Sequence, residues 1–128
     1  MTGGLVVSTD RAARPGGAYN QAILAGNLVF IAGFAPRLPG SRTLVEGGIV
    51  EQTRRTLENI EAVLQELGLG LEHLVQVTAY LQHLDRDKKL FDETYAAIVP
   101  QPWPARATIG AQLAGFLVEL DGIAVVPD

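Results

Sequence analysis

The fold is decided by residues 48–68, which read GIVEQTRRTLENIEAVLQELG. Apolar or small residues recur there at helical spacing, at Val50, Thr53, Leu57, Ile60, Leu64 and Leu67. Charged and polar side chains fill most other positions, and Gly68 is typical of the residue that follows a helix. A stripe on only one side predicts a helix that packs against a sheet.

The segments around this helix complete an α+β pattern. A second helix is predicted at residues 85–99, before Pro100, with an apolar face formed by Leu90, Phe91, Tyr95, Ile98 and Val99. Strands are predicted at residues 21–25, 28–32, 74–82, 105–111 and 117–126, with a turn at Gly26-Asn27 between the first two. This order predicts one domain, residues 1–128, with two helices on one face of a sheet.

The other face of the sheet carries an intermediate polarity. In residues 74–82, Val75, Val77, Ala79 and Leu81 alternate with Gln76, Thr78, Tyr80 and Gln82. The chain is 48% hydrophobic and only 19% charged, which leaves few charges to cover its surface. On polarity alone, we expect the face with Gln76, Thr78 and Tyr80 to pack on another subunit.

Composition excludes several classes of function. The net charge of −4 disfavours nucleic acid as a partner, and the lack of cysteine excludes disulfides and thiolate chemistry. The N-terminus does not resemble a signal peptide, and no apolar run is long enough to span a bilayer. We therefore expect a cytoplasmic protein without a membrane partner.

Few residues have a context that points to chemistry. Nucleotide-binding and nucleophile motifs are absent, and His73 and His83 flank a strand at opposite ends, as exposed histidines without a metal would. Arg106 starts an uncharged strand after the rigid Pro102-Trp103-Pro104. Its guanidinium is suited to bind a carboxylate, and the alternative is a structural salt bridge to an acid of the same fold.

Two acids lie on one face of the last strand. Glu119 and Asp121 alternate with Val118 and Leu120, either as candidate acids or as part of a solvated sheet face. If the last two strands form a hairpin, Arg106 lies opposite Asp121 or Gly122.

Tyr19 and Gly33 are candidates for a binding pocket. Tyr19 follows a glycine-containing loop, where it either lines a site or anchors the terminal segment. Gly33 ends a strand, as a turn residue or as a position that leaves room for a ligand.

These segments together resemble the RidA family, also called the YjgF family and once labelled L-PSP endoribonuclease. The strongest match is Pro104-Ala105-Arg106-Ala107-Thr108-Ile109 followed by Leu117-Val118-Glu119-Leu120. Further matches are residues 17–22, 31–36 and 51–60, so the resemblance spans about residues 13–126. It implies a chorismate-mutase-like (bacillus type) α+β fold, assembled as a homotrimer with ligand sites in the clefts between subunits.

The resemblance also implies an activity. Members of this family hydrolyse enamine or imine intermediates, such as 2-iminobutanoate and 2-iminopropanoate, to 2-oxo acids and ammonia, without cofactor or metal. Arg106 matches the arginine that holds the substrate carboxylate, and Glu119 matches the acid that orients the attacking water. Tyr19, Gly33 and the backbone carbonyl of Ala107 match further substrate contacts.

Three positions depart from the family pattern. Ala32 replaces a serine, Ala107 a cysteine and Asp92 an asparagine. If Asp92 faces the cleft, it would repel a carboxylate, and the substrate would differ from that of the family archetypes.

Two alternatives to an imine deaminase remain open. One is a non-catalytic or regulatory trimer that binds a small carboxylate, and the other, less favoured by the charge, is an endoribonuclease or translation inhibitor.

Overall fold

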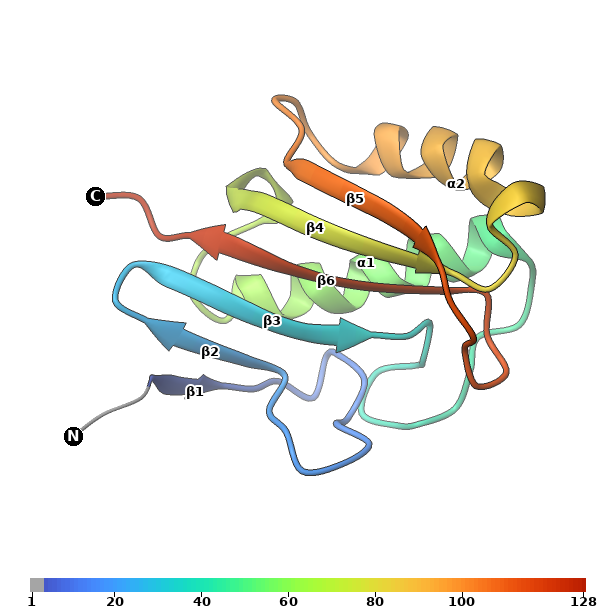
Figure 1. The fold of residues 1–128 in the computed structure, drawn as a ribbon. Coiled ribbons are helices and arrows are strands. Elements are labelled where there is room, and N and C mark those ends of the chain that lie inside the picture. Colours follow the sequence, from blue (N-terminus) through green and yellow to red (C-terminus); the bar gives the residue numbers. More distant parts are fainter. Residues whose placement is uncertain (1–3) are drawn as a thin grey trace.

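Residues 4–128, the part of the chain that the computed structural model describes, form a six-stranded sheet with two helices on one face (Figure 1). In chain order the elements are β1 (Leu5–Val7), β2 (Ala22–Ala25), β3 (Leu28–Phe34), α1 (Ile49–Gln65), the 3₁₀ turn η1 (Leu71–His73), β4 (Leu74–Leu81), α2 (Leu84–Ile98), β5 (Ala105–Gly110) and β6 (Val118–Val125). The strands lie in the order β1-β2-β3-β6-β4-β5. The predicted α+β architecture is confirmed.

Helix α1 confirms the predicted stripe. Thr53, Leu57 and Leu64 are buried, and the helix packs on β6 and β3. The carboxylate of Glu51 accepts a hydrogen bond from the Gly48 N–H at 2.8 Å, which satisfies a donor that the helix leaves free at its N-terminus. Removal of this apolar stripe from water is what holds the helix on the sheet.

Helix α2 was predicted correctly in position but not in every inward residue. Phe91 and Tyr95 are buried, with ring centroids 5.7 Å apart. The prediction for Leu90 was wrong, because its side chain is 48% exposed. The inward stripe runs through Asp87, Phe91 and Thr94 instead, so Leu90 lies on the outer flank of the helix.

The predicted strands are all present, with small differences at their ends. β2 and β3 form the expected hairpin, in which Ala25 pairs with Leu28 and Gly26 adopts a φ of +61°. Val75 is 45% exposed, contrary to its predicted inward position, because the pairing of β4 with β6 shifts register between Leu74 and Gln76.

The last two strands do not form a hairpin. β6 lies between β3 and β4 and is antiparallel to both, whereas β5 is parallel to β4 at the edge of the sheet. Arg106 pairs with Val77 of β4, which pairs in turn with Gly122. Arg106 is therefore level with Gly122 but separated from it by a whole strand.

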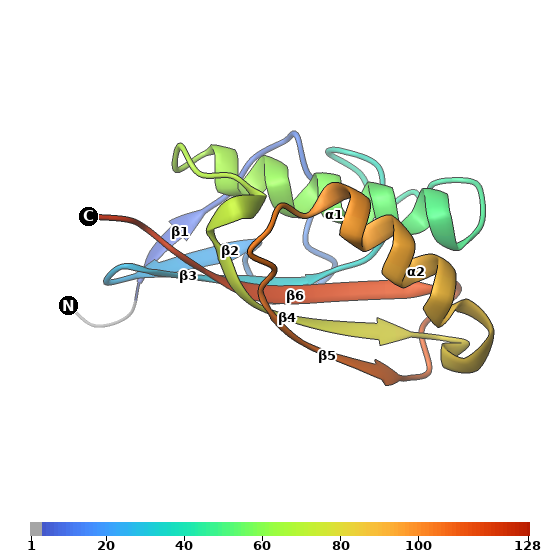
Figure 2. The same ribbon diagram turned by 90° about the horizontal axis from the view of Figure 1, so that it is seen from above.

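Both helices lie on the same side of the sheet, and Figure 2 shows its other side without a helix. Gln76, Thr78 and Tyr80 are half-buried on this open face, and Phe30 and Ile109 are exposed there. Its burial between subunits stays a prediction.

Candidate active site

Glu119 occupies the open face of the sheet, next to an irregular part of β3. It belongs to the outward set of β6 and pairs with Tyr80 of β4. On its other side, the β3–β6 register shifts between Ile31 and Phe34, and this bulge contains Gly33. A Cβ atom at Gly33 would lie 2.6 Å from Glu119 Oε2, so the space left by the missing side chain accommodates the Glu119 carboxylate.

Tyr19, Gly33 and Glu119 share a cavity of about 230 Å³, here called the Glu119 cavity. The Tyr19 hydroxyl accepts a hydrogen bond from the Gly16 N–H at 2.9 Å, so the tyrosine both lines the cavity and fixes the preceding loop. The structure thus brings together three of the predicted site residues, from the loop before β2, from β3 and from β6.

The Glu119 carboxylate is electrostatically unfavourable where it stands. Burial, and secondarily the charge of Asp121, raise the pKa of Glu119 above its usual value. Among residues 4–128, Glu119 forms no ion pair that would offset these effects. Asp121 itself accepts a hydrogen bond from the Tyr80 hydroxyl at 3.3 Å. A carboxyl group with a raised pKa in a cavity is suited to take up and release a proton.

Arg106 lies in a different place, on the helix side of β5. Its guanidinium stacks under α2, with Cζ 5.2 Å from the Phe91 ring centroid and 4.7 Å from that of Tyr95. Arg106 Nη2 donates to Asp92 Oδ1 at 2.6 Å. The structure therefore contains the salt bridge within the chain that the sequence left open as an alternative for Arg106.

Asp92 is held by two cations. Lys88 Nζ donates to its other oxygen at 2.8 Å. Partial burial opposes ionisation, but the hydrogen bonds from Lys88 and Arg106 outweigh it and hold the pKa of Asp92 below its usual value. Asp92 and Arg106 line one cavity of about 370 Å³ with Tyr95 and Trp103, here called the Arg106 pocket. Asp92 thus lines the Arg106 pocket and already binds one nitrogen of the Arg106 guanidinium.

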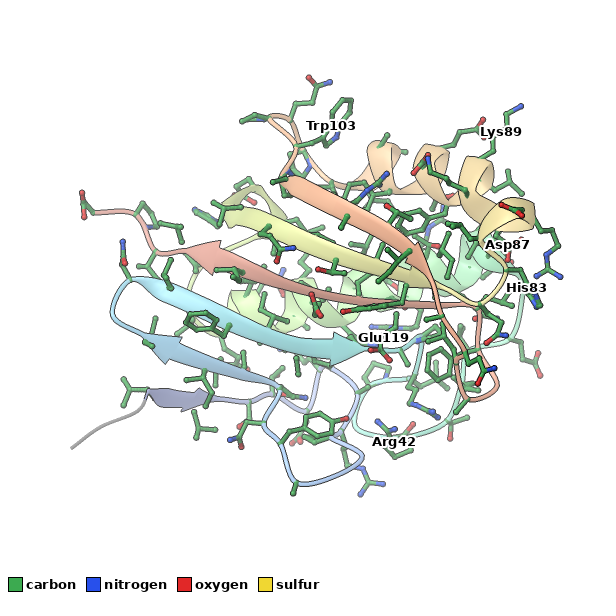
Figure 3. The ribbon with its side chains drawn as sticks, in the orientation of Figure 1. Arg42, His83, Asp87, Lys89, Trp103 and Glu119 are labelled. Carbon is green, nitrogen blue, oxygen red and sulfur yellow. The ribbon has the colours of Figure 1, made fainter. Side chains whose placement is uncertain are left out.

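The two predicted catalytic residues do not meet within one chain. Glu119 faces the open side of the sheet, Arg106 faces the helices, and β4 separates their strands. Figure 3 shows Glu119 near the end of β3, and it shows Trp103, which lines the Arg106 pocket, before the start of β5. Ala107 is exposed on the open face, level with Thr78.

A model of the family described as Endoribonuclease L-PSP matches residues 9–126 of this chain. The chain belongs to this family, the RidA family. A RutC family protein of Pyrococcus abyssi is 39% identical over 121 residues, which cover 93% of this chain and 94% of that protein. The chloroplastic Reactive Intermediate Deaminase A of Arabidopsis thaliana is 35% identical over 123 residues, which cover 94% of this chain and 65% of that protein.

Solved structures of RidA-family proteins have the same fold. RidA from an Antarctic Psychrobacter species is 30% identical, with a TM-score of 0.89 over 95% of this chain and 99% of that one. TdcF of E. coli, solved with bound serine, is 25% identical, with a TM-score of 0.88 over 96% of this chain and 98% of that one.

This RidA-family chain also has site residues that sequence reasoning missed. Arg37, Arg42 and Phe116 line the Glu119 cavity, and Trp103 lines the Arg106 pocket, where its indole N–H donates to the Val99 carbonyl at 3.0 Å. The sequence offered no local signal for the two arginines, because arginines in a loop are ordinarily solvated.

The histidines have local roles in this RidA-family chain. His73 Nδ1 accepts a hydrogen bond from the Gly70 N–H at 3.0 Å, and His83 directly precedes α2. In residues 4–128, no three His, Cys, Asp or Glu side chains are grouped so that they could hold a metal ion. Over the same residues, no helix has the length and apolar character needed to cross a membrane.

Proposed function

We propose that this protein hydrolyses enamine or imine intermediates of the 2-iminobutanoate and 2-iminopropanoate type to 2-oxo acids and ammonia. The observation that carries the proposal is the half-buried Glu119 carboxylate, which has no ion-pair partner in residues 4–128 and shares a small cavity with Tyr19 and Gly33. A relative named Reactive Intermediate Deaminase A and a related structure with bound serine support a small ligand derived from an amino acid.

Glu119 supplies the proton transfers that this reaction needs. A protonated imine is already electrophilic, so the protein has only to position it and a water molecule. Glu119 accepts a proton as the water oxygen bonds to the imine carbon, and the C=N double bond becomes a single bond to an amine. Glu119 then returns the proton to nitrogen, and the C–N bond breaks. The hydroxyl proton passes to the departing ammonia, which leaves the 2-oxo acid and ammonium. A raised pKa brings Glu119 closer to the ambient pH, where such exchange is efficient.

The site is completed in this proposal by a second copy of the chain. Arg106 of one copy holds the substrate carboxylate while Glu119 of the next orients the water, with the carbonyl of Ala107 assisting, in a homotrimer with three such clefts. Two features support assembly: β5 is an edge strand, and the open sheet face exposes Phe30 and Ile109. In solution we expect about three times the chain mass of 13.7 kDa.

The Arg106–Asp92 ion pair favours a second candidate function. A carboxylate ligand must compete with Asp92 for the guanidinium, and a protein that only binds a small carboxylate, without turnover, tolerates this competition. This candidate shares the proposed cleft and the proposed trimer, and differs only in the chemical step.

Ammonia release separates the two candidates. The purified protein is added to a pyridoxal-phosphate enzyme that releases 2-iminobutanoate, and the formation of ammonia and 2-oxobutanoate is followed. We expect acceleration by the wild type and a loss of about 100-fold or more in Glu119→Gln and in Arg106→Ala. Glu58→Gln, which changes an exposed acid on α1, is the matched control and should keep full activity. Binding of 2-oxobutanoate without acceleration for any imine derived from an amino acid would contradict the proposal and select the second candidate.

A further inference from the structure

Two arginines that have no part in the proposed chemistry line the Glu119 cavity. Arg37 follows β3 and forms an isolated bridge with Leu44, and Arg42 lies in the loop that this bridge closes. Figure 3 shows Arg42 on this loop, below the position of Glu119 at the end of β3. The Arg37–Arg42 pair and the Glu119 carboxylate thus line the same small space.

The Arg37–Arg42 pair is held in place by neighbouring backbone. Arg37 Nη1 donates to the Arg42 carbonyl at 2.6 Å, and Arg42 Nη1 donates to the Arg14 carbonyl at 2.8 Å. The Arg37 guanidinium also packs 5.5 Å from the ring centroid of Phe116. At Gly16, a Cβ atom would overlap the Arg42 guanidinium, so this glycine allows the close approach. Side chains ordered in advance lose little entropy when a ligand binds.

The charges of the Arg37–Arg42 pair are not compensated. Within residues 4–128, neither guanidinium forms an ion pair, and the buried Arg37 Nε has no hydrogen-bond partner. Burial and the charge of Arg42 lower the pKa of Arg37, yet arginine stays protonated in proteins. The lack of an ion pair is not due to a shortage of acidic residues, because the chain has 14 Asp and Glu and only ten Lys and Arg. Two neighbouring like charges, of which Arg37 is partly buried, repel each other in the free protein, and an anion placed between them would relieve this repulsion.

We propose that the Arg37–Arg42 pair binds a second anionic group of the ligand. The preferred substrates are then 2-imino acids whose side chain ends in a carboxylate or a comparable anion. This inference rests on the proposed function for its first contact, the carboxylate at Arg106 of the neighbouring copy.

The charge balance of the completed site supports a dianion. Two acids, Asp92 and Glu119, stand against four cations, Arg106, Lys88, Arg37 and Arg42, which leaves a net charge of +2 with all six groups ionised. The single carboxylate of a monoanionic ligand would meet an arginine that Asp92 already partly neutralises. A second anionic group would meet two arginines that form no ion pair within residues 4–128. The volume of about 230 Å³ lies below the roughly 300–1,000 Å³ of pockets for drug-sized ligands, which fits a short dicarboxylate.

Calorimetric titration with stable products tests this inference independently of turnover. The probes are 2-oxoglutarate, with two carboxylates, and 2-oxobutanoate, with one. We expect the wild type to bind 2-oxoglutarate at least about tenfold more tightly, because a charge-assisted arginine contact contributes that much. Arg37→Gln and Arg42→Gln should each reduce this preference, and both together should abolish it, with the affinity for 2-oxobutanoate unchanged.

Two controls keep the result interpretable. Arg54→Gln removes the same charge from an exposed position on α1 and should leave the preference intact. Arg42 is exposed, so Arg42→Gln tests the inference even if Arg37→Gln fails to fold. Equal affinity of the wild type for the two acids, or a preference that survives the double substitution, overturns the inference. A dianion preference in a protein that accelerates no imine hydrolysis supports the inference while the proposed function fails.

Discussion

The Glu119 cavity and the Arg106 pocket lie on opposite faces of one sheet, and they differ in whether their charged side chains form ion pairs. In the Arg106 pocket the arginine is paired with Asp92 at 2.6 Å and stacked on two aromatic rings. In the Glu119 cavity the acid and the Arg37–Arg42 pair are all without ion-pair partners in residues 4–128. Burial raises the pKa of Glu119, whereas the two cations around Asp92 lower the pKa of that carboxyl group.

This difference in ion pairing distinguishes charged side chains that stabilise the fold from charged side chains that remain available to a ligand. A paired and stacked guanidinium stabilises the packing of α2 on β5 before any ligand arrives. Uncompensated groups in a cavity lower the stability of the free protein, as groups kept for function commonly do. The following substitutions test this division, from the largest expected effect to the smallest.

Gly33→Val would disturb the Glu119 cavity most. A Cβ atom at position 33 would lie 2.6 Å from Glu119 Oε2, so the carboxylate must move by roughly an ångström to reach ordinary van der Waals contact. A displacement of that size costs about 100-fold in rate when the group positions a reactant. The measurement is kcat for imine hydrolysis.

The same change in a Glu119→Ala background provides the control. Without the carboxylate, Gly33→Val should cause little further loss of kcat, so the effects of the two substitutions on kcat should be strongly coupled. Full additivity would show that Gly33 acts through something other than Glu119.

Asp92→Asn would remove the ion-pair partner of Arg106 and leave this arginine unpaired, like the arginines of the Glu119 cavity. Asparagine can still accept a hydrogen bond but no longer compensates Arg106, so a substrate carboxylate meets a stronger cation. We expect KM to fall about tenfold with little change in kcat. Lys88→Gln removes only the other ion pair of Asp92 and should leave KM as it is. An unchanged KM in Asp92→Asn would mean that Asp92 does not limit Arg106.

The pH dependence of stability should differ in sign between Glu119→Gln and Asp92→Asn. Folding raises the pKa of Glu119. The stability that the Glu119 carboxyl group contributes is therefore present below its pKa in the unfolded chain, and it is lost as the pH rises through its pKa in the folded protein. Glu119→Gln should therefore raise Tm by a few degrees at neutral pH, with no gain in acid.

For Asp92 the sign is reversed. Folding lowers the pKa of Asp92. The stability that the Asp92 carboxyl group contributes is therefore present above its pKa in the unfolded chain, and it is lost as the pH falls through its pKa in the folded protein. Asp92→Asn should lower Tm slightly at neutral pH, and the loss should vanish in acid. Thermal melts between pH 3 and 8 measure both variants, and equal signs would contradict the proposed contrast.

The helices and most strands could be predicted from the sequence, because hydrophobic periodicity reports which side of an element is buried. It does not report which strands are neighbours, and the insertion of β6 between β3 and β4 was therefore missed. Val75 was assigned to the wrong face for a related reason. A single shift in register displaces the alternation, and no residue type marks it.

The candidate site was predicted residue by residue but not as an arrangement. The resemblance pointed to Arg106, Glu119, Tyr19 and Gly33, and three of these share a cavity. The Arg106–Asp92 contact joins β5 to α2 across fourteen residues, and nothing local in the sequence specifies it. Arg37 and Arg42 were overlooked because arginines in a loop are ordinarily solvated, and only the packing around Phe116 and Gly16 places them at a cavity.

The central position of β6 has a consequence for biosynthesis. The ribosome delivers β6 after every other strand in residues 4–128, yet β6 fills the gap between β3 and β4 and carries Glu119. Until it emerges, the nascent chain holds two incomplete sheet fragments with unpaired inner edges, which are prone to associate with other chains. Closure of the sheet thus depends on contacts between residues far apart in the sequence, and Glu119, the acid of the proposed site, is synthesised with the strand that completes the sheet.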